Sequence, residues 1–498
     1  MFRYVMRRLL LLLTSTILFT GCEKKDTSSD KTELVMLCAA GIKNPVTKIA
    51  EAYEEEYGVS VRLQFGGSGT LLSNLEIAGA DIYLAADSSY TDQAKEKGLV
   101  AETIPVASMK GGYGVLKGNP KKITSLIDLK REDIRVGIGN PEAASVGRFT
   151  KKILSKNGAW DSFEPAVTFP TVNELANALK LGTIDVAIIW DIIASQYSAI
   201  DFVSLPAFDA EKKDVTIAVA TSSKAPTEAL RFCRYLTARD KGLPIFKAEG
   251  FEVTEGDVWN ENPEILLFSG AMLRPAIQET IKSFEKREGV SIQPVYNGCG
   301  ILVSQMKAGE KPDAYFSCDL KFMTMVSDQF GESTIVSANE MVILTEKGNP
   351  KSITSLEILK IPGIRLGLSH PEKSALGFLT KKLLVSEGLH QKIIEVGNLK
   401  MESPTGDFLV NQIKAGSLDA VIVYRSNALA AASTAEDFEI VSIDRPGAFA
   451  TQPFAVGKES DHAQLMNRFL EACVSASGKK DFLQYGFRWE LKNSPSEP

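Results

Sequence analysis

The second half of this 498-residue chain repeats the first, and this repeat restricts the fold more than any other feature of the sequence. Residues 118–130 read GNPKKITSLIDLK and residues 348–360 read GNPKSITSLEILK, with ten identities in 13 positions. The offset is 348 − 118 = 230 residues, whereas solenoid units repeat roughly every 20–50 residues. A repeat of this length indicates two whole domains of similar fold.

Shorter matches in the same order extend the repeat over most of the chain. Residues 134–137 (IRVG) match residues 364–367 (IRLG), and residues 182–185 (GTID) match residues 416–419 (GSLD). The offset drifts by a few residues, as small loop insertions produce. We therefore expect two domains, at 33–256 and 264–498, joined by a linker at 257–263.

The N-terminus has the composition of a bacterial export signal. Three arginines within the first eight residues precede an apolar run at 9–18, which is too short to span a membrane comfortably. The run ends in LFTGC, which is similar to the lipobox of bacterial lipoproteins, so we expect a signal peptide at 1–21 and lipidation of Cys22. The polar residues 22–32 would then tether the protein to the outer face of a membrane. The alternative is an ordinary signal peptide with an incidental cysteine.

Charge and cysteine content narrow the class of partner. The net charge is −6 and no basic stripe is visible, which argues against a nucleic-acid partner, because such binding needs a cationic face. A mildly acidic protein still binds anions where N–H groups converge. The five cysteines after Cys22 lack metal-ligand spacing, and the chain has three histidines. We therefore expect no disulfide framework, metal site or cofactor.

Apolar runs of strand type alternate with amphipathic helical patterns in both halves. Residues 34–37 and 265–268 are short apolar runs, and each precedes a helical stripe, which in the first half is Val46, Ile49, Ala50 and Tyr53. This alternation predicts an α/β fold with parallel sheets and helices on both faces. Ligands of such sheets lie beyond the carboxyl ends of the strands, at loops that open helices.

Four such loops recur in both halves and carry the candidate ligand contacts. Small residues bring the backbone close to a ligand, and helix N-termini direct free N–H groups at it. The loops of the first half contain Ala40 and Gly41; Gly67, Ser68 and Gly69; Val146; and Val172 with Trp190 at a later strand end. The loops of the second half contain Met272; Cys299 and Gly300; Leu376; and Gly406 with Tyr424.

Each loop also has a purely structural interpretation. Small residues suit tight strand–helix packing, and Ser68 could simply cap the helix that we expect to start near Leu71. An aromatic residue at a strand end, such as Trp190 or Tyr424, is common in a core. A cysteine thiol is a weak donor, so Cys299 makes the second site poorer for an oxyanion.

Taken together and in order, these motifs resemble the periplasmic molybdate-binding protein family, which has the type II solute-binding fold of ABC importers. The sequence AAGIK at 39–43, GGSGTLL at 66–72, ADIYLAAD at 80–87 and GTIDVAIIW at 182–190 carry the resemblance. It implies that each domain has two α/β lobes with a ligand cleft between them. It also implies the contacts Gly41, Ser68, Val146, Val172 and Trp190 in the first half.

Both halves depart from the family pattern at these contacts. The family usually has a serine where this chain has Gly41 and a tyrosine where it has Trp190. In the second half, Met272 and Cys299 replace both serines, while Tyr424 keeps the tyrosine. The first site is therefore expected to work, and the second to have diverged.

The function implied is that of an extracytoplasmic, lipid-anchored binding protein that delivers a small oxyanion to an ABC permease and its ATPase. A molybdate-like or tungstate-like dianion needs donors only, and backbone N–H groups, including that of Gly69, would supply them. Phosphate, a ferric complex, a carboxylate, or a non-transport sensor or scaffold role remain alternatives. An enzyme is not expected, because no nucleophile–base pair or P-loop is visible.

Overall fold

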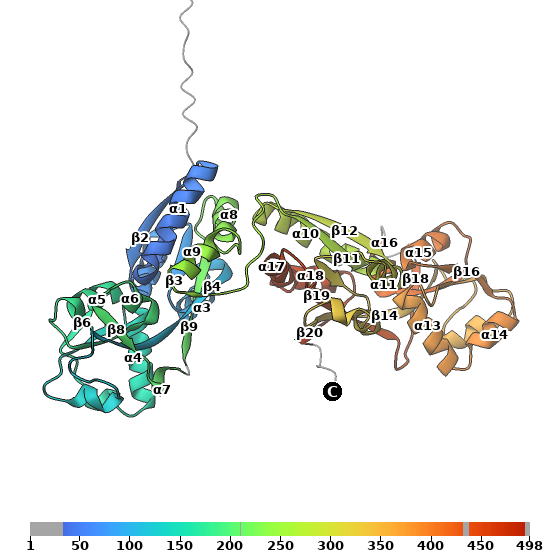
Figure 1. Ribbon diagram of the computed structural model, residues 1–498. Coiled ribbons are helices and arrows are strands. Elements are labelled where there is room, and N and C mark those ends of the chain that lie inside the picture. The colour runs from blue at the N-terminus through green and yellow to red at the C-terminus, as the bar shows by residue number, and fades with distance from the viewer. Residues whose placement is uncertain (1–32, 210, 432–437, 494–498) are drawn as a thin grey trace, which may run out of the picture.

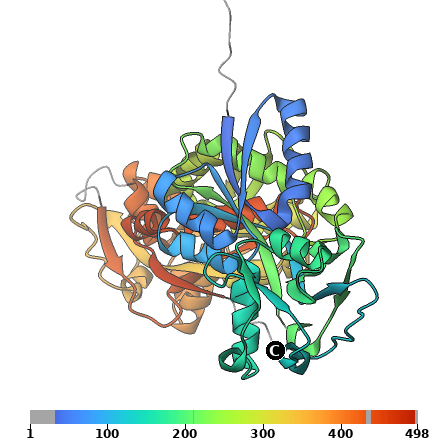
Figure 2. The ribbon, with the colours of Figure 1, turned by 90° about the vertical axis from the view of Figure 1, so that its left-hand side faces the viewer.

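The computed structural model describes residues 33–209, 211–431 and 438–493. The predicted signal peptide, Cys22 and the tether lie outside these residues. Figure 1 shows the two halves as separate bodies side by side, and Figure 2 shows the first half in front of the second. Over the described residues, no helix has the length and apolar character needed to cross a membrane.

The first half forms one mixed sheet that is shared between two lobes. Its strand order is β2-β1-β3-β9-β4-β7-β5-β6, with β8 and β10 also paired with β4. The strands are β1 (Glu33–Ala39), β2 (Ser60–Gly66), β3 (Ile82–Ala85), β4 (Val100–Leu116), β5 (Val136–Gly139), β6 (Val167–Phe169), β7 (Val186–Trp190), β8 (Ile200–Val203), β9 (Lys212–Ala220) and β10 (Glu252–Val253).

Helices follow most of these strands. They are α1 (Lys43–Tyr57), α2 (Ser68–Ala78), α3 (Ser88–Glu96), α4 (Ser145–Lys156), α5 (Val172–Lys180), α6 (Asp191–Ser195), α7 (Pro206–Asp209), α8 (Pro226–Leu236) and α9 (Gly242–Ala248). The predicted stripe of Val46, Ile49, Ala50 and Tyr53 is the buried face of α1. Burial of such a stripe is what holds a helix to a sheet in water.

The chain crosses between the lobes twice. We call the part of the first half with β1, β2 and β3 lobe 1, and the part with β5, β6 and β7 lobe 2. The first part of β4 pairs with β9 in lobe 1, and its last residues pair with β7 and β8 in lobe 2. The chain therefore enters lobe 2 through β4 and returns through β9. In Figure 1 lobe 1, with α1, α8 and α9, lies above lobe 2, with α4, α5 and β6. Two strands of this kind are a hinge about which two lobes can close on a ligand.

The expectation of parallel sheets is correct for part of each lobe. β1 pairs in parallel with β2 and β3, and β5 pairs in parallel with β6 and β7. β9 and β4, however, are antiparallel to their neighbours. β4 carries the chain from lobe 1 to lobe 2 and β9 carries it back, so these two neighbouring strands run in opposite directions.

The second half repeats this topology strand for strand, in the order β12-β11-β13-β19-β14-β17-β15-β16, with β18 and β20 paired with β14. The strands are β11 (Glu264–Gly270), β12 (Ser291–Asn297), β13 (Ala314–Phe316), β14 (Thr334–Glu346), β15 (Leu366–Ser369), β16 (Leu399–Ser403), β17 (Ala420–Tyr424), β18 (Phe438–Ser442), β19 (Phe449–Val456) and β20 (Arg488–Asn493). The helices are α10 (Arg274–Glu288), α11 (Cys299–Lys307), α12 (Leu320–Thr324), α13 (Ala375–Ser386), α14 (His390–Glu395), α15 (Gly406–Lys414), α16 (Arg425–Ala431), α17 (Ala463–Cys473) and α18 (Ala476–Gln484).

The segment 257–263, predicted to be a linker, contacts both halves. The Asp257 carboxylate accepts hydrogen bonds from the backbone N–H groups of Gln464 and Leu465 in α17, at 2.8 and 3.0 Å. The indole N–H of Trp259 donates to the hydroxyl of Tyr57 in α1 at 2.8 Å. The segment is therefore packed in place and does not behave as a free tether.

A buried ion pair, Arg234–Glu288, joins the two halves where α8 packs on α10 (Figure 1). Glu288, in α10, is 1% exposed and lies between Arg234 of α8 and Arg468 of α17. Arg468 donates to both carboxylate oxygens of Glu288, at 2.7 and 3.1 Å. Breaking a buried pair of this kind is costly because it leaves a charge without a partner.

Candidate functional site

A small cleft lies between the lobes of the first half, where several helix N-termini converge. Its cavity volume is small, about 20 Å³. It is lined by the end of β1, the β2–α2 junction, the residue after β3, the starts of α4 and α5, and the end of β7. The lining residues are Ala39, Ala40, Gly41, Gly66, Gly67, Ser68, Ala86, Ala144, Ser145, Val146, Thr171, Val172 and Trp190.

Ser68 presents a hydroxyl donor to this cleft. It is the first residue of α2, which therefore begins before Leu71, and it is 1% exposed. Its Oγ accepts a hydrogen bond from the backbone N–H of Ala86 at 3.2 Å and caps no helix. An oxygen that accepts this bond keeps its own proton for another acceptor. The helix-cap interpretation of Ser68 is therefore wrong.

The glycines of the β2–α2 junction allow the lobes to meet. A Cβ at Gly67 would lie 2.4 Å from the carbonyl oxygen of Ala143 and 2.6 Å from that of Pro170, both in lobe 2. The N–H of Gly69 donates to the Ala143 oxygen at 2.9 Å. The prediction that this N–H serves the ligand is therefore not met in the closed cleft. Its hydrogen bond holds the two lobes together instead.

All the cleft-lining side chains are uncharged. The nearby carboxylate of Asp87 is 2% exposed, caps α3 through the Ser89 N–H, and forms an ion pair with Lys213 at 3.2 Å. Its negative charge is thus already compensated. The first N–H groups of α2, α4 and α5 lack partners within their helices and carry the positive ends of the helix dipoles. The cleft therefore suits an anion that accepts hydrogen bonds.

Trp190 forms one wall of the cleft and also belongs to the core. It is 1% exposed, and its ring lies 5.1 Å from that of Phe149, centroid to centroid. The core interpretation of this residue is therefore correct, and the same ring also lines the cleft. Its apolar surface would exclude water from a bound ion.

A cation–aromatic contact joins the lobes beside the cleft. The guanidinium of Arg148, in α4 of lobe 2, stacks over the ring of Tyr90, in α3 of lobe 1, at 3.9 Å. Burial raises the pKa of Tyr90 to about 12, so the phenol is neutral at physiological pH. In the second half, Lys321 of α12 lies 3.1 Å from the ring centre of Phe378 in α13. Both halves therefore close with a cation–π contact between lobes.

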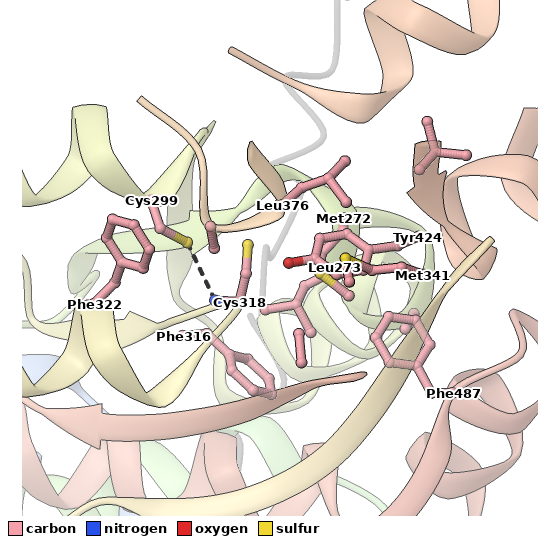
Figure 3. Close-up of a cluster of buried hydrophobic side chains, with 14 of the residues drawn as sticks. Met272, Leu273, Cys299, Phe316, Cys318, Phe322, Met341, Leu376, Tyr424 and Phe487 are labelled. Atoms are coloured by element: carbon pink, nitrogen blue, oxygen red, sulfur yellow. Dashed lines mark hydrogen bonds between the residues drawn. The ribbon is translucent and has the colours of Figure 1, made fainter. Parts of the chain in front are cut away.

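The equivalent cleft of the second half is filled by its own side chains (Figure 3). Met272 is 3% exposed, Cys299 0%, Leu376 1% and Tyr424 2%. The N–H of Cys318 donates to Cys299 Sγ at 3.2 Å, which reproduces the bond from Ala86 to Ser68 in the first half. The two halves therefore share one geometry and differ in chemistry.

Backbone contacts also close this second cleft. A Cβ at Gly300 would lie 1.9 Å from the carbonyl oxygen of Glu372, and one at Gly298 would lie 2.3 Å from that of Lys373. Gly406 opens α15 against Asn427, whose Oδ1 would lie 2.5 Å from a Cβ there. Gly298 and Gly300 of the second half thus lie where its two lobes meet, as Gly67 and Gly69 do in the first half.

Of the residues predicted for the first half, all but Gly69 line the cleft. Six more residues line it that were not among the predicted contacts: Ala39, Gly66, Ala86, Ala144, Ser145 and Thr171. Ala86 has no reactive group to mark it, and its contribution is its place after β3. Ser145 could have been predicted from the sequence, because it carries a hydroxyl and lies directly before Val146, at the start of α4.

Comparisons with known proteins agree with two copies of one domain. The family model of bacterial extracellular solute-binding proteins matches residues 34–252 and, separately, residues 265–488. A "Putative binding protein" of Haemophilus influenzae is 27% identical over 256 residues, which are 49% of this chain and 97% of that protein. "Molybdate-binding protein ModA" of Escherichia coli is 26% identical over 238 residues, 45% of this chain and 91% of that protein. Each relative thus corresponds to about half of this chain.

Solved structures give the same coverage. The periplasmic molybdate-binding protein of Azotobacter vinelandii covers 45% of this chain and 100% of its own, with 16% identity and a TM-score of 0.40. The sulfate-binding protein SubI of Mycobacterium tuberculosis covers 46% of this chain and 87% of its own, with 19% identity and a TM-score of 0.40.

Proposed function

This chain belongs to the bacterial extracellular solute-binding proteins, whose family model it matches twice, and we propose that it is the binding component of an ABC importer. We propose that its ligand is a small oxyanion, molybdate or tungstate, which it captures in its first cleft. The ligand is held between the lobes by backbone N–H groups and hydroxyls. The closed pair of lobes is the form that a permease and its ATPase recognise. Relatives named as molybdate-binding proteins, at 26–27% identity, support this choice of ligand.

The observation that carries the proposal is a small cleft lined only by uncharged groups at helix N-termini. A fully deprotonated tetrahedral dianion has acceptors and no proton, so it needs donors alone. Phosphate keeps a proton near neutral pH and is better served by a carboxylate acceptor. The cleft is lined by no Asp or Glu among the described residues, which favours a dianion without a proton.

Ser68, Val146 and Val172 are the contacts that we propose first. Ser68 supplies its hydroxyl, and Val146 and Val172, at the starts of α4 and α5, supply backbone N–H groups. Gly41 takes the place of a side-chain donor, so Ser145 is proposed as the second hydroxyl. A Cβ at Gly41 would lie 3.2 Å from Val172 Cγ1, so a larger residue there would require Val172 to shift by a few tenths of an ångström.

Calorimetric titration of the purified protein with molybdate, tungstate, sulfate and phosphate tests the proposal. We expect molybdate and tungstate to bind more tightly than sulfate, and phosphate to bind weakly if at all. Ser68→Ala removes one hydrogen bond to a charged group, worth about 1.5–3 kcal/mol, so affinity should fall roughly 10- to 150-fold. Ser73→Ala is the matched control, because Ser73 is an exposed residue of the same helix. If none of the four ions gives a measurable heat of binding, the assignment of an oxyanion ligand is refuted.

We also propose that Cys22 carries a lipid that anchors the protein to a membrane, with the two domains on its extracytoplasmic side. The support is the sequence LFTGC after an apolar run at 9–18. Expression with a labelled fatty acid should label the wild-type protein and leave Cys22→Ser unlabelled. Equal labelling of both proteins would contradict the anchor.

A further inference from the structure

The second cleft contains two cysteine sulfurs where the first contains a hydroxyl and a methyl group. Cys299 occupies the position of Ser68, and Cys318 that of Ala86, because the same hydrogen bond links each pair at 3.2 Å. Both cysteines are free thiols and are buried. The second cleft therefore has two sulfur atoms, which are soft metal ligands, at the positions where the first cleft has one hydroxyl oxygen and one methyl group.

A residue next to the two cysteines also differs between the halves. A Cβ at Gly270 would lie 2.0 Å from Cys318 Sγ and 3.2 Å from Cys299 Sγ, whereas the equivalent residue of the first half is Ala39. The thiol of Cys318 thus takes the space of a methyl group. Both sulfurs also lie within 3.2 Å of one point, so they share one small volume.

A second pair of substitutions adds the thioether of Met272 beside the two cysteine sulfurs. Met272 stands at the position of Gly41, and Gly406 at that of Val172, so a larger residue on one side is offset by a smaller one on the other. The turn that holds Met272 contacts α15, which Gly406 opens. Figure 3 shows Met272, Cys318 and Tyr424 gathered in one cluster. The volume is conserved while the chemistry changes.

Two hydrogen-bond donors lie beside the sulfur of Cys299. Its sulfur accepts from the N–H of Cys318, and the hydroxyl of Ser317 lies 3.9 Å away.

Tyr424 supplies an unused donor beside the sulfurs. Its side chain is 2% exposed, and its hydroxyl has no hydrogen-bond partner among the described residues. In Figure 3 the hydroxyl oxygen points toward the Cys318 sulfur. A buried hydroxyl without a partner is costly, and the sulfur of Cys318 is a potential acceptor for it.

We propose that the second cleft binds a soft monovalent cation, Cu(I), between the sulfurs of Cys299 and Cys318. Thiolates select Cu(I), zinc and iron–sulfur clusters, but zinc and such clusters need about four protein ligands. Among the described residues, no three His, Cys, Asp or Glu side chains are grouped for a metal. Two sulfurs suffice for Cu(I), which accepts linear two-coordination. Protons still on the sulfurs leave for solvent as the ion enters, and no change of oxidation state occurs.

The test is an anaerobic titration of the reduced full-length protein with Cu(I) in competition with a chromophoric Cu(I) chelator. We expect one tightly bound Cu(I) per chain and a near-ultraviolet thiolate-to-copper absorption band. Cys299→Ser and Cys318→Ser should each weaken binding by 100-fold or more and remove the band. Cys473→Ala is the matched control, because Cys473 is an equally buried cysteine of the same half and lies outside the cleft. Circular dichroism verifies that each variant is folded.

Two results would overturn the proposal. One is Cu(I) affinity in the folded Cys299→Ser and Cys318→Ser variants equal to that of Cys473→Ala. The other is a Cys299–Cys318 disulfide in the isolated protein, with no Cu(I) uptake after reduction, which would make the pair a redox couple instead. Ser68→Ala should leave Cu(I) binding unchanged, so failure here is distinguishable from failure of the oxyanion site.

Discussion

At the residue scale, the ligand cleft of the first half depends on the absence of side chains as much as on their presence. Gly67 lies against two carbonyl oxygens of the opposite lobe, and Gly69 donates its N–H to one of them. Both lie where the lobes touch, next to Ser68. These residues therefore determine how closely the lobes approach, while Ser68 and the helix N-termini offer the hydrogen-bond donors.

Gly67→Ala should weaken ligand binding without destabilising the protein in its open form. The added methyl group would lie 2.4 Å from the Ala143 oxygen only when the lobes are closed. The backbone of Gly67, at φ −68° and ψ 143°, suits alanine. Overpacking typically costs about 1–3 kcal/mol, so affinity should fall roughly 5- to 150-fold. Calorimetry measures the affinity, and the melting temperature without ligand should stay within a degree of wild type.

A control for this prediction is Gly58→Ala at the end of α1. Gly58 has φ +70°, and a Cβ added there would meet no atom within 4 Å, so the substitution strains the backbone far from the cleft. It should lower stability and leave affinity unchanged. The reverse pattern at Gly67, with lost stability and wild-type affinity, would contradict the role of lobe closure.

At the scale of elements, the closed form is held by helices that face each other across the cleft. Arg148 of α4 stacks on Tyr90 of α3, and Lys321 of α12 stacks on Phe378 of α13. The second half thus reverses which lobe supplies the cation. The same closure is reached with different residues, which indicates that closure itself is retained in both halves.

Arg148→Ala should favour the open form of the first half. A cation–π contact is worth about 0.5–2 kcal/mol, so oxyanion affinity should fall roughly 2- to 30-fold. Lys151→Ala is the matched control, because Lys151 lies over Trp160 within lobe 2 and spans no cleft. Equal affinities for both variants and the wild type would show that the Arg148 contact does not hold the lobes together.

The sequence predicted the elements of this cleft better than their contacts. The repeat and the alternation of strand and helix patterns identified β1, α1, β11 and α10, because burial imposes a period that can be read directly. The antiparallel pairing of β4 and β9 was not visible, because it depends on the chain crossing between lobes. Gly69 was assigned to the ligand for a similar reason: only the folded chain shows that the Ala143 oxygen takes its N–H.

At the scale of the whole molecule, the two halves are joined by buried charges as well as by the chain. Glu288 of the second half, which Arg468 of the same half also contacts, pairs with Arg234 of the first half, and Glu102 of the first half accepts two hydrogen bonds from Arg287, both at 2.8 Å. The segment 257–263 packs on both halves. The halves are therefore expected to unfold together and not independently.

Glu288→Ala should uncouple the two halves. It leaves two buried arginines without their carboxylate, at a cost of about 3–5 kcal/mol. Burial acts to raise the pKa of Glu288, but the two arginines outweigh it and lower the pKa below the usual value. The stabilisation is therefore present above the unfolded pKa, near 4.5, and is lost as the pH falls through the lower folded value.

Differential scanning calorimetry at neutral pH tests this coupling. The wild type should show one transition, and Glu288→Ala a lower or divided one. Glu279→Ala, an exposed position of the same helix, is the control. A Glu288→Ala transition identical to that of the control would mean that the pairs do not join the halves.

We propose that one fold, used twice in this chain, carries one oxyanion site. The stoichiometry of molybdate binding to the purified protein, measured by calorimetry with metal analysis of the dialysed complex, tests this. We predict one molybdate per chain, none in Ser68→Trp, and one in Cys299→Ser. Two molybdate ions per chain, or loss of binding in the folded Cys299→Ser variant with binding retained in Ser68→Trp, would rule out a single oxyanion site in the first half.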